Sequence, residues 1–159
     1  MIFSIFCKID QGSLGFKNQP APVNEINVES KKPFGLKITK ANINLNVEES
    51  QIVNGNWEVS RDGVSHLNTS SIPGNDGNIV IYGHNKSNIL GSLNTVKNGD
   101  EIIITTRDNE VHKYVVKSVE VVSPSRVDVI NPTEKEVLTI YTCTGLLDSK
   151  RLVVKAEPV

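Results

Sequence analysis

The sequence predicts a single, mostly β domain that closes into a barrel of about seven to eight strands with one or two short helices. Beyond residue 34, the apolar residues occur in short runs that are rich in Val and Ile and are separated by Gly, Asn, Asp and Pro. This pattern is typical of strands. Closure is expected because an open sheet of that size would leave unpaired edges. The length of 159 residues is also that of one domain.

The runs predicted to be strands span residues 36–40, 43–47, 78–82, 101–106, 111–122, 137–142 and 151–156. Residues 107–110 are polar and lie between two of these runs, which indicates a hairpin loop. Residues 89–96 carry apolar side chains at positions 89, 90, 93 and 96. That spacing would place them on one face of a short helix.

The first part of the chain differs in composition. Residues 11–35 are rich in Gly, Asn, Pro, Ser and Lys, which is typical of a linker. We therefore expect residues 1–33 to be an N-terminal segment and linker, and residues 34–159 to be the functional domain. The apolar run at residues 1–7 is much shorter than the roughly 20 residues of a membrane-spanning helix. Our hypothesis is that this run is the remnant of a membrane anchor lost by truncation.

The charge balance excludes two classes of partner. The chain has 17 basic and 18 acidic residues, a formal net charge of −1, and neither sign is collected into a long run. Binding of nucleic acid or of a membrane surface through charge is therefore not expected. Cys7 and Cys143 are too few to build a disulfide scaffold. No cofactor is predicted.

Cys143 is the first candidate for chemistry, because it lies where an apolar strand meets a Thr-Gly turn. A strand end holds a nucleophile rigidly while the following loop leaves it open to substrate. However, a single cysteine is more often a small buried hydrophobe, so its position alone does not establish catalysis.

Three histidines are present, His66, His84 and His112. His84 follows Gly83 at the end of the predicted strand 78–82, and we expect this glycine to let the backbone turn sharply. His66 is expected in a polar loop and His112 at a solvent-facing strand position. An imidazole can accept and return a proton near neutral pH, and position favours His84 for that role. Taken alone, a histidine at this position is more often a turn residue bonded to its own loop.

Arg151 begins the last predicted strand, after a short loop that follows Cys143. Two antiparallel strands would bring the two residues to the same end of the sheet. A guanidinium there would favour the thiolate and could donate to an oxyanion. The alternative is an ordinary solvated arginine at a strand edge.

The ordered motifs resemble the sortase family of cysteine transpeptidases. The matching segments are the Pro-Gly-Asn-Asp-Gly-Asn stretch at 73–78, the strand ending in Gly-His at 78–84, the Leu to Gly-Asp stretch at 93–102, the strand ending in Thr-Cys at 138–143, and Arg151. The resemblance covers roughly residues 36–159. The resemblance implies a sortase-like β-barrel in which Cys143, His84 and Arg151 are catalytic. Thr142 and Asn85 are expected to contribute to substrate binding.

The resemblance also implies partners and a location. Sortases cleave a sorting signal such as Leu-Pro-x-Thr-Gly through a thioacyl enzyme and pass the protein to an amine of a cell-wall precursor or pilin. They act on the extracellular face of the bacterial membrane or in the cell wall. Membrane contact of this chain is expected only through the N-terminal anchor of the hypothesis above.

The sequence departs from the family at two points. Asn85 stands where many members have arginine, and the acidic residues Asp100, Glu101, Asp108 and Glu110 are spread too widely to form the calcium site of some members. No metal site is therefore predicted. Two other functions stay open: a cysteine peptidase or hydrolase that uses the same three residues, and a non-catalytic β-barrel binding domain in which Cys143 is merely buried.

Overall fold

The fold comes from a computed structural model, which describes residues 25–159. The apolar run at residues 1–7 and Cys7 lie outside the described residues, so the anchor hypothesis stays a prediction.

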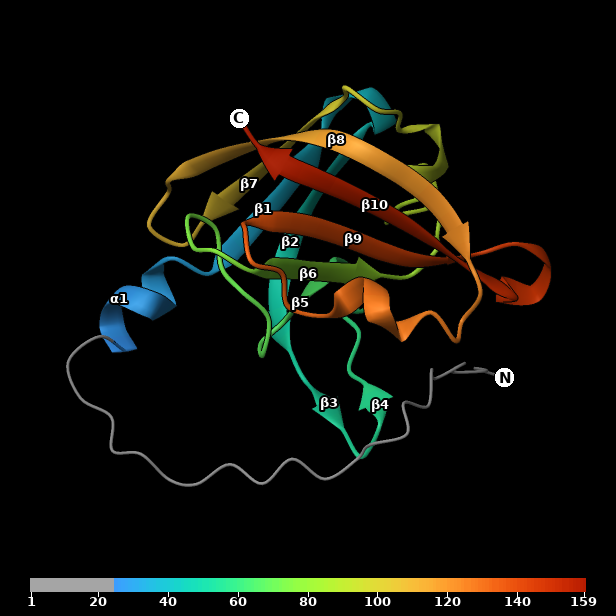
Figure 1. The fold of residues 1–159 in the computed structure, drawn as a ribbon, viewed down its shortest axis with the longest axis horizontal. Helices are drawn as coiled ribbons and strands as arrows, with labels where there is room; N and C mark the ends of the chain where they lie inside the picture. Colours follow the sequence, from blue (N-terminus) through green and yellow to red (C-terminus); the bar gives the residue numbers. More distant parts are fainter. Residues whose placement is uncertain (1–24) are drawn as a thin grey trace.

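Eight strands form a closed barrel, which confirms the predicted fold class (Figure 1). In their order around the barrel they are β1 (Pro33–Ile38), β2 (Ile43–Ser50), β5 (Val64–Leu67), β6 (Asn78–Gly83), β9 (Val137–Thr144), β10 (Lys150–Pro158), β8 (Val111–Val122) and β7 (Glu101–Thr106). The β2–β5 and β6–β9 pairs are parallel and the other pairs are antiparallel. All the predicted strands belong to the barrel.

The remaining elements are short. They are the helix α1 (Glu25–Ser30), the separate hairpin of β3 (Ile52–Val53) and β4 (Asn56–Trp57), and the 3-10 helices η1 (Thr39–Ala41), η2 (Leu93–Thr95), η3 (Val127–Ile130) and η4 (Leu146–Asp148). In Figure 1 the β3–β4 hairpin projects from one side of the barrel.

The barrel interior is filled by apolar side chains from every part of the sheet. On β9, Leu138 and Ile140 are fully buried in this core, and Leu152 and Val154 join them from β10. Side chains alternate across a strand. Tyr141, the residue after Ile140, therefore points outward, where it packs against two smaller apolar clusters outside the barrel.

The prediction of a helix over residues 89–96 is wrong. Only the 3-10 turn η2 forms, although Ile89, Leu90, Leu93 and Val96 are all buried as their spacing indicated. The segment folds back on itself, and a Cβ at Gly91 would lie 2.7 Å from the carbonyl oxygen of Lys86. This tight approach favours a compact loop over regular helix.

His66 was wrongly expected in a loop. It lies in β5 and is 1% exposed. Its Nδ1 contacts the Glu49 carboxylate of β2, and its Nε2 lies 2.9 Å from the carbonyl oxygen of Ser71. The strand was missed because Ser65 and His66 interrupt its apolar pattern; both are buried with polar partners.

Glu49 links this histidine to the start of the barrel. Its second oxygen lies 3.3 Å from Lys32, which also pairs with Glu29 of α1. Burial alone would raise the pKa of the Glu49 carboxyl, but the hydrogen bond and charge of His66, together with the charge of Lys32, bring that pKa below its ordinary value of 4.5. The ion pairs therefore stabilise the charged carboxylate in the folded state.

We predict that Glu49 makes folding stability depend on acid pH. A carboxyl whose pKa is depressed in the folded state contributes stability above its unfolded pKa, and this stability is lost as pH falls through the folded pKa. Thermal unfolding between neutral pH and about pH 3 should therefore show a shallower acid loss in Glu49→Gln than in wild type.

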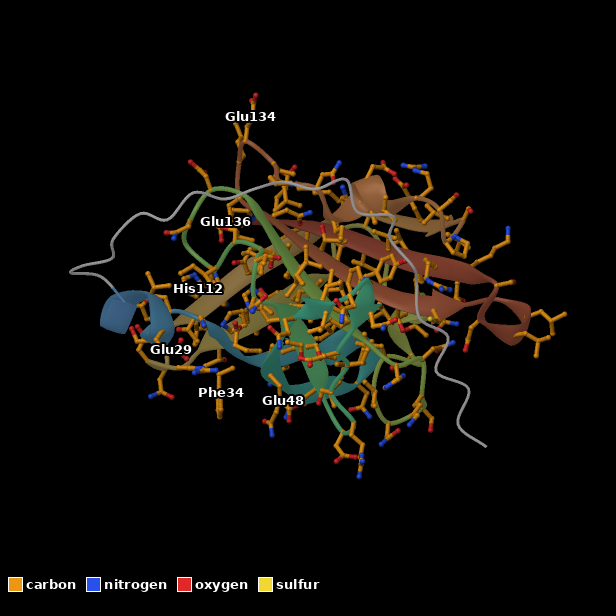
Figure 2. All side chains as sticks on the ribbon, turned by 90° about the horizontal axis from the view of Figure 1, so that it is seen from below. Glu29, Phe34, Glu48, His112, Glu134 and Glu136 are labelled. Carbon is orange, nitrogen blue, oxygen red and sulfur yellow. The ribbon has the colours of Figure 1, made fainter. Side chains whose placement is uncertain are left out.

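Glu48→Gln is the matched control, because Glu48 is exposed and points away from the barrel in Figure 2. An acid loss in Glu49→Gln as steep as in the Glu48→Gln control would contradict the role of the ion pairs.

Candidate active site

Cys143 is the penultimate residue of β9 and is half-buried. It pairs directly with Arg151 of β10 in the antiparallel register. By alternation it shares the outer face of the sheet with Tyr141. The thiol thus lies at the end of a rigid strand, outside the apolar core.

His84 approaches Cys143 from the opposite side. It follows β6 directly, and β6 runs parallel to β9 with Gly83 paired to Thr142. The residue after Gly83 is His84, in the loop that begins where β6 ends, and the residue after Thr142 is Cys143 on β9. The three predicted residues therefore come from the end of β6, from β9 and from β10, with the cysteine on the middle strand; Figure 1 shows β6, β9 and β10 side by side.

Thr142 ties β6 and β9 together at this point. Its hydroxyl donates a 2.8 Å hydrogen bond to the carbonyl oxygen of Gly83, and the side chain is 2% exposed. This hydroxyl is therefore engaged with the backbone of β6, directly before His84. Asn85 is exposed in the loop after His84.

Arg151 is 3% exposed, which is unusual for an arginine. One guanidinium nitrogen, Nη1, donates to the carbonyl oxygens of Asp148 at 2.7 Å and Lys150 at 2.9 Å. These bonds hold the guanidinium against the β9–β10 loop. A solvated edge charge, the alternative interpretation of this residue, does not fit its burial.

The β9–β10 loop has an unusual backbone and surface. Leu147 and Asp148 have φ values of 52° and 56°, in the left-handed region that side chains usually avoid. Leu146 and Leu147 are 84% and 85% exposed. The loop therefore presents two apolar side chains to solvent next to the cysteine.

Gly83 has a different role from the one expected. It is not among the glycines with positive φ, so the backbone does not need glycine for a sharp turn. Instead, a Cβ at Gly83 would lie 3.0 Å from Val64 and 3.3 Å from Leu90. The absence of a side chain lets β6 pack closely just before His84.

His84 is exposed, and its imidazole is partly desolvated. Burial and, after it, the positive charge of Lys86 hold its pKa below the ordinary value of 6.5, while Asp148 acts in the opposite direction. Neutral imidazole is therefore the major form at neutral pH, and the imidazolium is a minor one.

A second histidine cluster has the connectivity of a catalytic triad without its function. Ser70 Oγ lies 3.2 Å from His66 Nε2, and His66 Nδ1 contacts Glu49. However, the Ser70 hydroxyl donates to the carbonyl oxygen of Leu67 at 2.7 Å, and His66 is buried. A nucleophile must give its proton to the base and meet substrate, so this cluster is structural.

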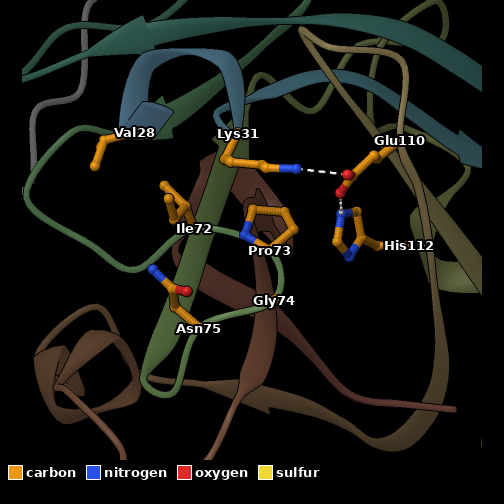
Figure 3. Close-up of a pocket in the computed structure, with 8 residues that line it drawn as sticks. All are labelled: Val28, Lys31, Ile72, Pro73, Gly74, Asn75, Glu110 and His112. Atoms are coloured by element: carbon orange, nitrogen blue, oxygen red, sulfur yellow. Dashed lines mark hydrogen bonds and ion pairs between the residues drawn. The ribbon is translucent and has the colours of Figure 1, made fainter. Parts of the chain in front are cut away.

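The structure also has a hollow of about 420 Å³, drawn in Figure 3, between α1, the segment before β6 and the β7–β8 hairpin. Lys31 and Glu110 form an ion pair of 2.5 Å across it, and His112 lies 3.6 Å from Glu110. Gly74, also in its lining, precedes the start of β6, whereas His84 follows the end of β6. The hollow is therefore separate from the cysteine site.

The side chain of His112 is 21% exposed, so it faces this hollow rather than open solvent.

Among residues 25–159, no group of three or more His, Cys, Asp and Glu side chains is arranged to hold a metal ion. In the same part of the chain, no helix has the length and apolar character needed to cross a membrane.

Fold and site together define a β-barrel protein with a strand-end cysteine between a histidine and an arginine. The Sortase domain family matches residues 36–159, so the chain belongs to the sortase family.

Individual relatives are similar over parts of the chain. Sortase A of Bacillus anthracis is 33% identical over 87 residues, which cover 52% of this chain and 41% of that protein. Sortase A of Streptococcus agalactiae is 29% identical over 131 residues, covering 77% of this chain and 51% of that protein. The matched parts are thus about half or less of these two relatives.

Solved structures agree in fold. A Clostridium perfringens sortase D5 transpeptidase superposes with a TM-score of 0.67 at 27% identity, covering 80% of this chain and 79% of that one. A lid mutant of sortase A from Corynebacterium diphtheriae gives 0.68 at 27% identity, covering 86% and 74%.

We predict that Gly83→Ala disturbs the site through packing. The added methyl group would press on Val64 and Leu90, and overpacking of this kind costs roughly 1–3 kcal/mol. Thermal unfolding should show the loss. Gly35→Ala is the control, because its Cβ would meet its nearest neighbour at an ordinary 3.6 Å. Equal stability of the two variants would contradict close packing at Gly83.

We further predict opposite shifts of the His84 pKa in two charge variants. Lys86→Gln removes a charge that disfavours the imidazolium, so the pKa of His84 should rise. Asp148→Asn removes a charge that favours it, so that pKa should fall. NMR titration of the imidazole carbon-bound protons measures both. Lys40→Gln, a change in a lysine that does not act on His84, should leave the titration unchanged; shifts in the same direction for both variants would overturn this account.

Proposed function

We propose that the protein is a sortase-type cysteine transpeptidase that cleaves a sorting signal similar to Leu-Pro-x-Thr-Gly. The observation that carries the proposal is the placement of Cys143 between Arg151, its direct partner on β10, and the position that follows β6, occupied by His84. Membership of the sortase family supports the same three residues.

The first half-reaction forms a thioacyl enzyme. Cys143 gives its proton to His84, and the Sγ thiolate attacks the threonine carbonyl carbon of the signal. The carbonyl π electrons move to oxygen and give a tetrahedral oxyanion. When this intermediate collapses, the C–N bond to glycine breaks, and the imidazolium of His84 gives the leaving amine its proton. A thioester to Cys143 remains.

The second half-reaction transfers the acyl group. An amine of a cell-wall precursor or pilin attacks the thioester carbon, and the neutral imidazole of His84 removes the proton of that amine. The Cys143 thiolate leaves, and a new amide bond is formed. The lowered pKa of His84 suits this step, because the neutral base is the major form at neutral pH.

Arg151 is proposed to orient the substrate and to donate to the oxyanion. The bonds of Nη1 to the loop carbonyls leave the rigid guanidinium in one orientation beside the cysteine. A preorganised donor of this kind costs about 2.7–4 kcal/mol of transition-state stabilisation when it is removed. Thr142 and Asn85 are proposed to assist substrate binding, Thr142 through its bond to Gly83.

The proposed partners are surface proteins or pilins that carry the sorting signal, together with the amine acceptor. Such substrates would place the protein on the extracellular face of a bacterial membrane or in the cell wall. No cofactor takes part in the proposed reaction, since thiol, imidazole and guanidinium supply the nucleophile, the acid and base, and the oxyanion donor.

We predict that Cys143→Ala abolishes cleavage of a fluorescently labelled sorting peptide and that His84→Ala lowers kcat/KM by about 10²–10⁴. His112→Ala is the matched control and should keep wild-type activity, because His112 lines the separate hollow. Loss of activity in His112→Ala but not in His84→Ala would refute the proton-transfer assignment.

The same assay tests Arg151 and separates the two chemical outcomes. Arg151→Lys should lower kcat/KM by about 10²–10³, because lysine keeps the charge but lacks the planar fork. Adding triglycine should convert the product from hydrolysed peptide to a triglycine conjugate. Hydrolysis alone at high triglycine would indicate a peptidase, and a Cys143 thiol inert to alkylation in the folded protein would indicate a binding domain.

A further inference from the structure

The outer face of the sheet beside Cys143 is apolar and aromatic. Tyr141 lies on the same face of β9 as Cys143, and it pairs with Tyr82 of β6 and Val153 of β10. Tyr141 packs against both outer clusters, one around Tyr82 and the other around Val153. Tyr82 and Val153 are 3% and 2% exposed, whereas Tyr141 is only partly buried, so Tyr141 joins the two clusters and reaches the surface two residues before the cysteine.

Trp57 of the β3–β4 hairpin packs against this outer face of the sheet. Its ring stacks on Tyr141 with a centroid distance of 5.9 Å and an interplanar angle of 18°. It also meets Tyr82 edge-to-face at 4.7 Å and 83°. Both geometries are favourable aromatic contacts. Trp57 thus contacts both aromatic rings that lead to the active site.

The hairpin depends on these rings for its position. β3 and β4 pair only with each other, at two residue pairs, and the connecting Asn54 and Gly55 have positive φ values, as a tight hairpin turn requires. The hydroxyl of Tyr82 donates a 2.6 Å bond to the carbonyl oxygen of Glu58, directly after Trp57. A two-stranded hairpin is marginal by itself, so its packing on Tyr82 and Tyr141 holds it in place.

The ring of Trp57, rather than its N–H group, makes these contacts. The side chain is 8% exposed, and its Nε1 is buried with no hydrogen-bond partner among the described residues. A buried donor without an acceptor lowers stability. The position therefore calls for a large aromatic face and does not use the indole donor.

From this arrangement we propose that Trp57 is a positioning residue for substrate selection. It holds the ring of Tyr141 in the wall of the peptide-binding surface, and that wall receives the apolar side chain of the sorting peptide on the amino-terminal side of the scissile bond. This inference rests on the proposed function. In a signal of the Leu-Pro-x-Thr-Gly type, the apolar residues precede the threonine, and the partly exposed ring of Tyr141, two residues before Cys143 on the same face of β9, offers them an apolar contact.

The chain contains one tryptophan, so intrinsic fluorescence reports on Trp57 alone. In the Cys143→Ala variant, which cannot turn over, titration with an unlabelled sorting peptide should change the Trp57 emission in parallel with binding measured by anisotropy of a labelled peptide. Binding by anisotropy without any emission change would overturn the inference while leaving the proposed function intact. Absence of binding and of wild-type turnover would instead count against the proposed function.

Selectivity provides the second readout. Wild type should prefer a peptide with Leu at the first signal position over one with Ala by roughly 10–200-fold in kcat/KM, as expected for a filled apolar pocket. Trp57→Ala should reduce this preference about tenfold or more through KM. The kcat for a saturating peptide should stay near wild type, because the cysteine, histidine and arginine are untouched. Trp57→Phe keeps an aromatic face and removes the orphan donor, so it should retain most of the preference.

Val53→Ser is the matched control in the same hairpin, because Val53 is 41% exposed and lies outside the aromatic contacts. It should behave as wild type. Unchanged selectivity in Trp57→Ala, with folding verified by thermal unfolding, would refute the positioning role, as would an equal loss of selectivity in Val53→Ser.

Discussion

The pairing of β9 with β6 on one side and with β10 on the other is the constraint on which the site depends. Because side chains alternate along a strand, a slip of one residue in either pair would turn Cys143 into the barrel core and Ile140 out of it. The fully buried residues of β9 and β10 oppose such a slip. The same apolar packing that stabilises the barrel therefore places the thiol outside it, between two neighbouring strands.

Buried polar groups set the finer geometry at this end of the barrel. The hydroxyl of Thr142 joins β9 to the last residue of β6, and the close packing of Gly83 leaves no room for a side chain before His84. Arg151 is held by two carbonyl oxygens of its own loop, which has left-handed residues. Groups held in this way need little reorganisation during a reaction, which is the main source of electrostatic catalysis.

Away from this site, charged residues connect strands of the barrel. The network of Glu49, His66 and Lys32 connects β2, β5 and the start of β1, where two strands run parallel. Parallel pairs lack a tight connecting turn, so side-chain contacts help to fix them. The β3–β4 hairpin lies within the connection between β2 and β5 and brings Trp57 onto the outer face of the sheet. Barrel closure and the shape of the surface beside Cys143 are thus linked through one connection.

Much of this protein was determined by local sequence. Runs of Val and Ile bounded by Gly, Asn and Pro identified seven of the eight barrel strands, and the strand-end positions of Cys143, His84 and Arg151 marked the candidate site, because these signals depend on neighbours in sequence. Tertiary structure decided the rest. The strand β5 carries a buried polar residue, His66, whose partner Glu49 lies on the separate strand β2. The packing at Gly83 and the stacking of Trp57 on Tyr141 arise from contacts between segments far apart in the chain, which local periodicity does not reveal.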